Sequence, residues 1–154
     1  MLYVRLAHFL GMSLWIGGAV AVVVVERAVA VWSTPDRARA LPLLAKLHAY
    51  VIAPGAIVTT VSGVLITMSM VNRGMSAAMA RPGIVVMQAA GMLAAVLAVF
   101  VGVPTANRLA VRASMLAAGE NPPVIVALQK RQTIVSSIAT FLVVVSLIFA
   151  VVVR

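Results

Sequence analysis

Four long stretches without a formally charged side chain are the strongest constraint in this sequence. They are 20 to 26 residues long, and a hydrocarbon core of about 30 Å needs roughly 20 residues of helix to cross it. Lipid offers backbone N–H and C=O groups no partners, so each crossing stretch must be a helix. The stretches are residues 6–25, 47–72, 82–107 and 132–153. The sequence therefore predicts an all-α transmembrane four-helix bundle.

The remaining residues extend these helices and connect them within one domain, residues 1–154. We expect helices over about 3–32, 43–72, 82–118 and 124–153. Hydrophobic residues make up 64% of the chain, which leaves too little polar sequence for a separate soluble domain. The apolar runs lack the stripes of a soluble helical protein and the alternation of a transmembrane β-barrel.

The basic residues indicate membrane topology rather than nucleic-acid binding. The net charge is +9, but the cations are concentrated in the predicted connections. Eight belong to the first and third connections, namely Arg27, Arg37, Arg39, Lys46, Arg108, Arg112, Lys130 and Arg131. Four belong to the opposite side, namely Arg5, Arg73, Arg81 and Arg154. Because basic loops stay in the cytoplasm, the bundle should run up-down-up-down with both termini extracytoplasmic.

The second predicted helix contains two features that shape its course. Residues 33–36 read as a turn before it, with Pro42 near its start, and Pro54 in its interior predicts a kink. Small residues then recur every four positions at Gly55, Thr59, Gly63 and Thr67. Such a stripe is typical of close helix–helix packing in membranes, and it would also make room for a flat cofactor.

The candidate site lies on the first helix. His8, Met12 and Trp15 follow one another at i, i+4 and i+7 and therefore share a face, with Gly11 and Gly18 on the same side. An ionisable residue within a membrane span indicates function by default. This face suits an aromatic ring or a soft metal, with the glycines clearing the pocket. The alternative is that His8 only satisfies a carbonyl or a lipid headgroup.

Candidate side chains that could bind a cofactor together with His8 can be predicted from their depth in the membrane. Met87 and Gln88 of the third helix should lie about 7.5 Å inside the outer boundary, close to His8, and Met68 and Met70 end the second helix there. Methionine can pair with histidine on haem iron and also binds Cu(I). It is also common core filler, so the second ligand stays open among Met87, Met68 and, remotely, His48.

The second histidine, His48, should lie near the opposite boundary. It differs in depth from His8 by roughly 20 Å across a 30 Å core, which argues against one iron held by both. Polar residues at its level could gather into an interfacial network, a proton path or an anion site; they are Glu26, Asn107, Arg108, Gln132 and Thr133.

Three segments resemble a superfamily of small bacterial four-helix membrane proteins. Residues 7–18, AHFLGMSLWIGG, resemble its first-helix signature of His, then Trp seven residues on, then Gly. Residues 52–55, IAPG, and 103–109, VPTANRL, resemble parts of its second and third helices. The superfamily includes the CopD-type copper-resistance domain, the HemJ-type protoporphyrinogen oxidase and uncharacterised proteins of this size, to which the chain is most similar.

That resemblance implies a multi-pass protein of the bacterial cytoplasmic membrane in which His8 binds haem or a porphyrin. HemJ-like enzymes carry a basic residue early in the third helix, whereas residues 84–88 here are IVVMQ; this departure disfavours oxidase activity, and no catalytic residue is assigned. We expect a haem b-binding protein for electron transfer or haem handling. The alternatives are a HemJ-type oxidase, a Cu(I) uptake or resistance protein, and a structural subunit without cofactor. The expected partners are the lipid bilayer and either a second copy or a membrane redox protein.

Overall fold

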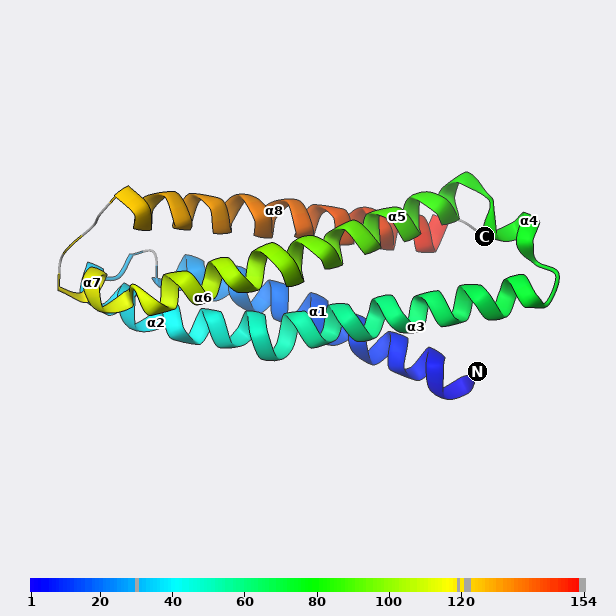
Figure 1. Cartoon of the computed structure of the whole chain (residues 1–154), viewed down its shortest axis with the longest axis horizontal. Coiled ribbons are helices and arrows are strands. Elements are labelled where there is room, and N and C mark those ends of the chain that lie inside the picture. The colour runs from blue at the N-terminus through cyan, green and yellow to red at the C-terminus, as the bar shows by residue number, and fades with distance from the viewer. Residues whose placement is uncertain (30, 119, 121–122, 153–154) are drawn as a thin grey trace.

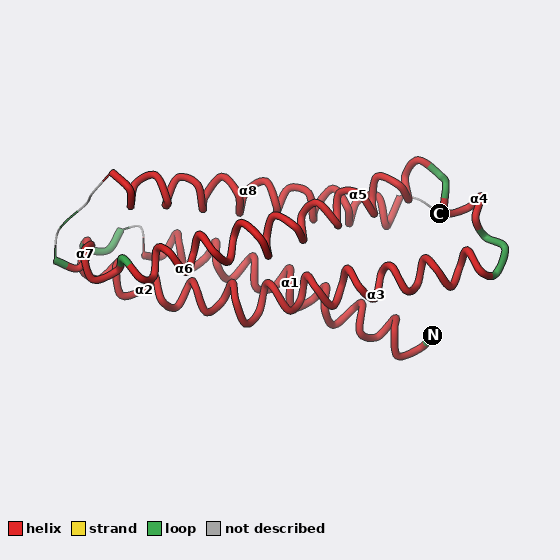
Figure 2. Tube along the Cα trace, viewed as in Figure 1, coloured by secondary structure: helices red, strands yellow, loops and turns green. Residues whose placement is uncertain are grey.

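The computed structural model describes residues 1–29, 31–118, 120 and 123–152, and within them every regular element is helical. Figure 2 shows short loops between long helices. The elements are α1 (Leu2–Val29), α2 (Thr34–Leu47), η1 (His48–Ile52), α3 (Ala53–Asn72), α4 (Ser76–Met79), α5 (Pro82–Val96), η2 (Leu97–Gly102), α6 (Val103–Val111), α7 (Ala113–Ala117) and α8 (Pro123–Val152). The symbols η1 and η2 denote single π-helical turns.

Four continuous rods in the described part of the chain are long and apolar enough to cross a membrane. They span Leu2–Val29, Pro35–Asn72, Pro82–Val111 and Pro123–Val152, and an 18-residue window within each has a mean hydropathy of 2.0, 1.9, 2.5 and 2.7 respectively. Large apolar side chains such as Phe9, Tyr50, Phe100 and Phe141 are exposed on the outside. An apolar outer surface is stable only against lipid, so the chain is a multi-pass membrane protein, as the uncharged stretches predicted.

Successive rods run in opposite directions, so that the bundle has two ends (Figure 1). The α4 end holds the start of α1, the α3–α5 connection and the end of α8. The α7 end holds the α1–α2 connection and the passage from α6 to α8. These two names are used below.

Helix α2, the first part of the second rod, begins at Thr34, not at about residue 43 as predicted. Ser33 is the N-cap of α2 and accepts a hydrogen bond from the backbone N–H of Asp36, at 3.4 Å, while Pro35 occupies the first turn. Such a Ser-Thr-Pro-Asp segment stabilises a helix start, because it satisfies an orphan N–H and fixes φ. Pro42 consequently lies inside the helix. The turn predicted at residues 33–36 is therefore the start of the helix itself.

The limits of the other rods differ less from expectation. The first ends at Val29 rather than at about residue 32, and the third breaks at Arg112 before the short α7, so it is not one helix to residue 118. The fourth begins at Pro123, and the predicted end at residue 153 lies outside the described residues.

Each middle rod contains a π turn directly before a proline. Ala53 N–H bonds to the carbonyl of His48, five residues back, ahead of Pro54; Val103 N–H bonds likewise to Ala98 ahead of Pro104. A proline ring clashes with the carbonyl four residues back. One wider π turn shifts the pattern of backbone hydrogen bonds by one residue, and this accommodates the proline. Pro54 is therefore accommodated by a π turn within a continuous 38-residue rod, where the sequence suggested only a kink.

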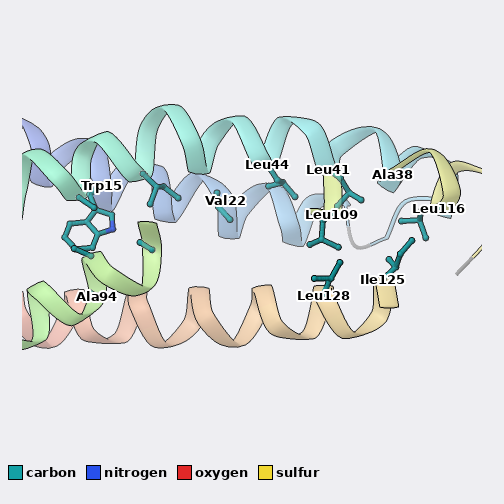
Figure 3. Packing of buried hydrophobic residues seen from close by; sticks show 14 residues of the cluster. Trp15, Val22, Ala38, Leu41, Leu44, Ala94, Leu109, Leu116, Ile125 and Leu128 are labelled. Carbon is teal, nitrogen blue, oxygen red and sulfur yellow. The ribbon is translucent and has the colours of Figure 1, made fainter. Parts of the chain in front are cut away.

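The helices associate as two pairs, α1 with α3 and α5 with α8. In the first pair the backbones nearly touch: a Cβ added at Gly55 would lie 2.6 Å from the nitrogen of Trp15, and one at Gly11 would lie 2.8 Å from Thr59 Oγ1. The pairs meet toward the α7 end, where α2 also packs on α6 and α7. Figure 3 shows the buried cluster there, which includes Leu41, Leu44, Leu109, Leu116, Ile125 and Leu128 and extends to Trp15.

Candidate cofactor cavity

A cavity of about 450 Å³ lies at the α4 end between the two helix pairs. Its walls come from α1, α3, α4, α5 and α8, and its volume is within the roughly 300–1,000 Å³ of small-molecule and cofactor sites. We call it the cofactor cavity. The predicted residues that line it are His8, Met12, Trp15, Met68, Met70, Met87 and Gln88. The depth argument from the sequence thus placed side chains from three helices around one space.

His8 is held in place by hydrogen bonds to one of its two ring nitrogens, Nδ1. Its Nδ1 lies 2.9 Å from the carbonyl oxygen of Thr59 and 3.0 Å from Ser62 Oγ. A carbonyl oxygen can only accept, so Nδ1 carries the proton and Nε2 has a lone pair. In the described part of the chain no hydrogen bond to Nε2 is found. Metal-binding histidines commonly donate their other N–H to a backbone carbonyl in this way.

Gly63 provides the space in which the His8 ring lies. A Cβ added at Gly63 would stand 3.2 Å from His8 Cε1 and 3.6 Å from Nδ1. The sequence assigned this glycine to a packing stripe. The stripe in fact has two uses: Gly55 admits the backbone of α1, and Gly63, two turns further along α3, admits the imidazole.

Gly11 and Gly18 do not line the cofactor cavity, contrary to the prediction that they clear it. Gly11 faces Thr59, and a Cβ at Gly18 would lie 2.9 Å from Ile52 Cγ1. Both therefore serve the contact of α1 with α3 and η1. The i, i+4, i+7 spacing identified the correct face for His8, Met12 and Trp15. A glycine has no side chain to show which edge of that face it occupies.

Methionines dominate the donor set of the cavity. Six of the nine in the chain line it, from four different helices. They are Met12, Met68, Met70, Met79, Met87 and Met92. Among the lining residues His8 is the one histidine, and none is Asp, Glu, Lys, Arg or Cys. No group of three or more His, Cys, Asp or Glu that could hold a metal occurs in the described residues, so a metal here would rest on His8 and thioethers.

Polar side chains tie the two helix pairs together across the cavity. Gln88 Nε2 on α5 donates to Thr67 Oγ1 on α3 at 2.9 Å, and Thr67 in turn donates to the carbonyl of Gly63 at 3.0 Å. Within the second pair, Ser146 Oγ on α8 donates to the carbonyl of Met87 on α5 at 2.9 Å. Gln88 therefore holds the wall of the cavity, where the sequence predicted a cofactor contact.

His48 lies in a different part of the bundle. It is 4% exposed; its Nδ1 donates to the carbonyl of Leu44 at 2.9 Å, and its Nε2 accepts from Gln132 Nε2 at 2.8 Å. It lies 11 residues before Thr59, the level of His8, which is about 16 Å along a helix. With both ring nitrogens engaged and outside the cofactor cavity, His48 is excluded as the second ligand of a site at His8.

Two smaller cavities continue toward the α7 end. A middle cavity of about 120 Å³ lies between Trp15 and His48, with mainly apolar walls. A cavity of about 190 Å³ follows, which we call the polar cavity after the polar side chains in its otherwise apolar wall. These are His48, Gln132, Thr133, Glu26, Arg37 and Gln129; the other lining residues are Val29, Leu41, Leu44, Ala106 and Leu109. Of the polar residues expected to gather there, Asn107 and Arg108 are not part of its lining.

The cofactor cavity thus offers one anchored imidazole with an available lone pair, thioethers at several heights and an apolar wall. This arrangement can bind iron or a soft metal axially and can surround a flat apolar ring. Comparison with known proteins adds no assignment: no protein-family model matches the chain, and neither a curated protein nor a solved structure is significantly similar to it.

Proposed function

We propose that the protein binds haem b in the cofactor cavity, with His8 Nε2 as an axial ligand of the iron, and serves electron transfer or haem handling. One observation carries the proposal. The Nδ1–H of His8 is held by the Thr59 carbonyl, so that Nε2 is the ring nitrogen left to bind a metal beside a cavity of about 450 Å³. A haem bound there would supply one-electron redox chemistry.

The residues of the chain would bind this group and shield it. The carbonyl of Thr59 and the space at Gly63 fix the orientation of the imidazole. Met68 and Met87 are the candidates for a second ligand; a histidine with a methionine would raise the reduction potential relative to two histidines. Trp15, which is 4% exposed, closes the cavity toward the middle of the bundle. The apolar side chains of the wall would surround the group and limit its contact with water.

We further propose the placement of the protein in the bacterial cytoplasmic membrane. The α7 end, with eight of the basic residues, would be cytoplasmic, and both termini would be extracytoplasmic at the α4 end. The cofactor cavity would then lie in the outer half of the bilayer. The similarity of residues 7–18 to the CopD/HemJ superfamily motivates the same placement. A second copy or a membrane redox protein would exchange the electrons.

Cu(I) binding is the second candidate, because six methionines line the same cavity as His8. Thioethers and imidazole are ligands that Cu(I) prefers. Copper transport needs no macrocycle, so it would leave the protein colourless. A HemJ-type oxidase has less support: His8 is the one ionisable side chain of the wall, and it would have to serve as both ligand and base.

Reconstitution separates these functions. Haem-depleted protein in detergent is titrated with haem b, and in parallel with Cu(I) under a competing chelator. The Soret band of the wild type should saturate at one haem per chain, and His8→Ala should give no such band. His48→Asn is the matched control, because it alters the other histidine and should retain the band. Tight Cu(I) uptake without haem binding would replace the proposal by the second candidate, and binding of neither would favour a structural subunit.

A further inference from the structure

The polar cavity between α1, α2, α6 and α8 contains an unusual buried group. Gln132 is 5% exposed, and its Oε1 is buried without a hydrogen-bond partner among the described residues. Leaving a buried acceptor unsatisfied is costly. Its amide group is otherwise engaged: Nε2 lies 2.8 Å from His48 Nε2 and 3.4 Å from Ser136 Oγ.

The orientation of this amide is dictated by His48. Nδ1 of His48 must donate to the carbonyl of Leu44, so in the neutral ring Nε2 is an acceptor and needs the NH₂ group of Gln132. The oxygen of Gln132 is then forced away from the ring. If the ring gains a proton, Nε2–H becomes a donor and the amide must turn to present its oxygen. The pair therefore has two hydrogen-bonded arrangements that differ by one proton.

The space beside the pair is large enough for water. The cavity measures about 190 Å³, which holds about six waters at the liquid volume of roughly 30 Å³ each. Its rim reaches the surface toward the α7 end, where Thr133 is exposed and Glu26 and Gln129 are half-buried. Glu26 on α1 and Arg37 on α2 are the other ionisable residues of its wall; the lining residues of α6 and α8 carry no charge.

The opposite side of His48 is closed. The middle cavity has mainly apolar walls, including Ile52, Ala98 and Ala139, and Trp15 separates it from the cofactor cavity. A continuous water path through this region has too few polar partners. His48 therefore has a polar approach from the α7 end and an apolar barrier toward the α4 end.

We propose that the polar cavity is a water-filled proton site that gives His48 access to the α7 end alone. Water bound to Gln132 Oε1 and the Glu26 carboxylate relays a proton from solvent at the α7 end to His48 Nε2, whose lone pair is freed as the NH₂ group of Gln132 turns away. The ring becomes an imidazolium, Nδ1–H stays on the Leu44 carbonyl, and the Gln132 amide turns so that its oxygen accepts from Nε2–H. Deprotonation returns the proton to the same water. This site is distinct from the cofactor cavity and does not depend on what binds there.

Cysteine accessibility tests the site without background, because the chain has no native cysteine. Single-cysteine proteins in sealed vesicles are treated with a membrane-impermeant methanethiosulfonate from either side. Val31→Cys marks the α7 end and Met75→Cys the α4 end, since both positions are exposed in connections. Gln132→Cys should react from the Val31 side only. Ile134→Cys, on the lipid-facing side of α8, is the matched control and should react at least about tenfold more slowly, because apolar surroundings suppress the thiolate.

Two outcomes would overturn the proposal. If the Gln132→Cys protein does not react under conditions in which the Val31→Cys protein reacts, the cavity is dry. If Gln132→Cys is labelled from the side on which Met75→Cys reacts, the barrier at Trp15 is absent.

A measurement on the unaltered protein guards against misfolding of the variants. With only two histidines, ¹⁵N-histidine NMR resolves both, and His8→Ala assigns them. The His48 signals should change reversibly from the Nδ1–H tautomer to the doubly protonated ring as the pH is lowered. A His48 that stays neutral over the whole range in which the protein is folded would contradict the proposal. Neither experiment involves haem, so failure here leaves the proposed function standing, and the reverse also holds.

Discussion

The two halves of the bundle use the same kind of helix for opposite purposes. Toward the α7 end, buried side chains such as Leu116 and Ile125 pack between the helices and leave only the smaller polar cavity of about 190 Å³. Toward the α4 end the two helix pairs leave a cavity of about 450 Å³. The contrast shows that hydrophobicity does not distinguish a filled core from a binding cavity in a membrane bundle. Side-chain size and the spacing of the helix pairs do.

The largest expected effect is a loss of stability from a substitution in the filled half. Ile125 is 0% exposed, so Ile125→Ala should lower the free energy of unfolding by about 2–5 kcal/mol, through lost contacts and a new cavity. Met92→Ala in the wall of the cofactor cavity should cost clearly less, since Met92 is 49% exposed and already adjoins a void. Unfolding in mixed detergent micelles measures both. Equal losses would mean that the two halves are packed alike.

The junction of the halves should be the next most sensitive place. A Cβ at Gly55 would meet the backbone of Trp15 at 2.6 Å, where no flexible side chain can give way. Gly55→Ala should therefore destabilise the protein by about 1–3 kcal/mol through overpacking. Gly17→Ala is the control, because nothing lies within 4 Å of its added Cβ. If Gly55→Ala is as stable as Gly17→Ala, the close α1–α3 contact is not present in the membrane.

A smaller change should affect binding in the open half with little loss of stability. Gly63→Ala places a methyl group 3.2 Å from His8 Cε1 and displaces the ring by a few tenths of an ångström. We expect haem affinity to fall by about tenfold, equivalent to about 1.4 kcal/mol. Haem titration followed by absorbance gives the ratio to wild type. Unchanged affinity would show that the position of His8 does not govern binding.

The smallest predicted effect concerns the polar tie across the cavity. Thr67→Val removes the acceptor of the Gln88 amide and should cost about 1 kcal/mol of stability. Ser13→Ala is a matched loss of one hydroxyl, because Ser13 bonds only within its own helix to the carbonyl of Phe9, and it should cost less. A larger loss for Ser13→Ala would indicate that Thr67 and Gln88 do not join the helix pairs.

Much of this architecture is readable from the sequence because lipid imposes it. The length of the uncharged stretches predicted the four spans. The spacing of His8, Met12 and Trp15 predicted that they share a face, and depth from the charged boundaries predicted that Met87 and Gln88 lie near His8. The start of the second rod was missed, since Ser33 and Pro35 suit a helix start as well as a turn. The π turns were missed as well: Pro54 signals a disturbed ladder but not its form.

The features that sequence reasoning could not reach depend on which helices are neighbours. Gly11 and Gly18 were predicted to clear the cavity but instead contact α3 and η1, because the role of a glycine depends on what lies opposite it. Depth in the membrane correctly predicted that Gln132 lies at the level of His48, but their direct hydrogen bond joins positions 84 residues apart, and no local pattern indicates it. Buried polar partners between distant helices emerge only when the pairing of the rods is known.

The most direct test of the central claim is chemical rescue at His8. Wild-type protein expressed with ample haem should purify with a Soret band, His8→Gly should lack it, and added imidazole should restore it by occupying the vacated space beside Thr59. His48→Gly, treated identically, should keep the band throughout and show no response to imidazole. A His8→Gly protein that retains a full Soret band, or a folded wild type that never acquires one, would contradict this account.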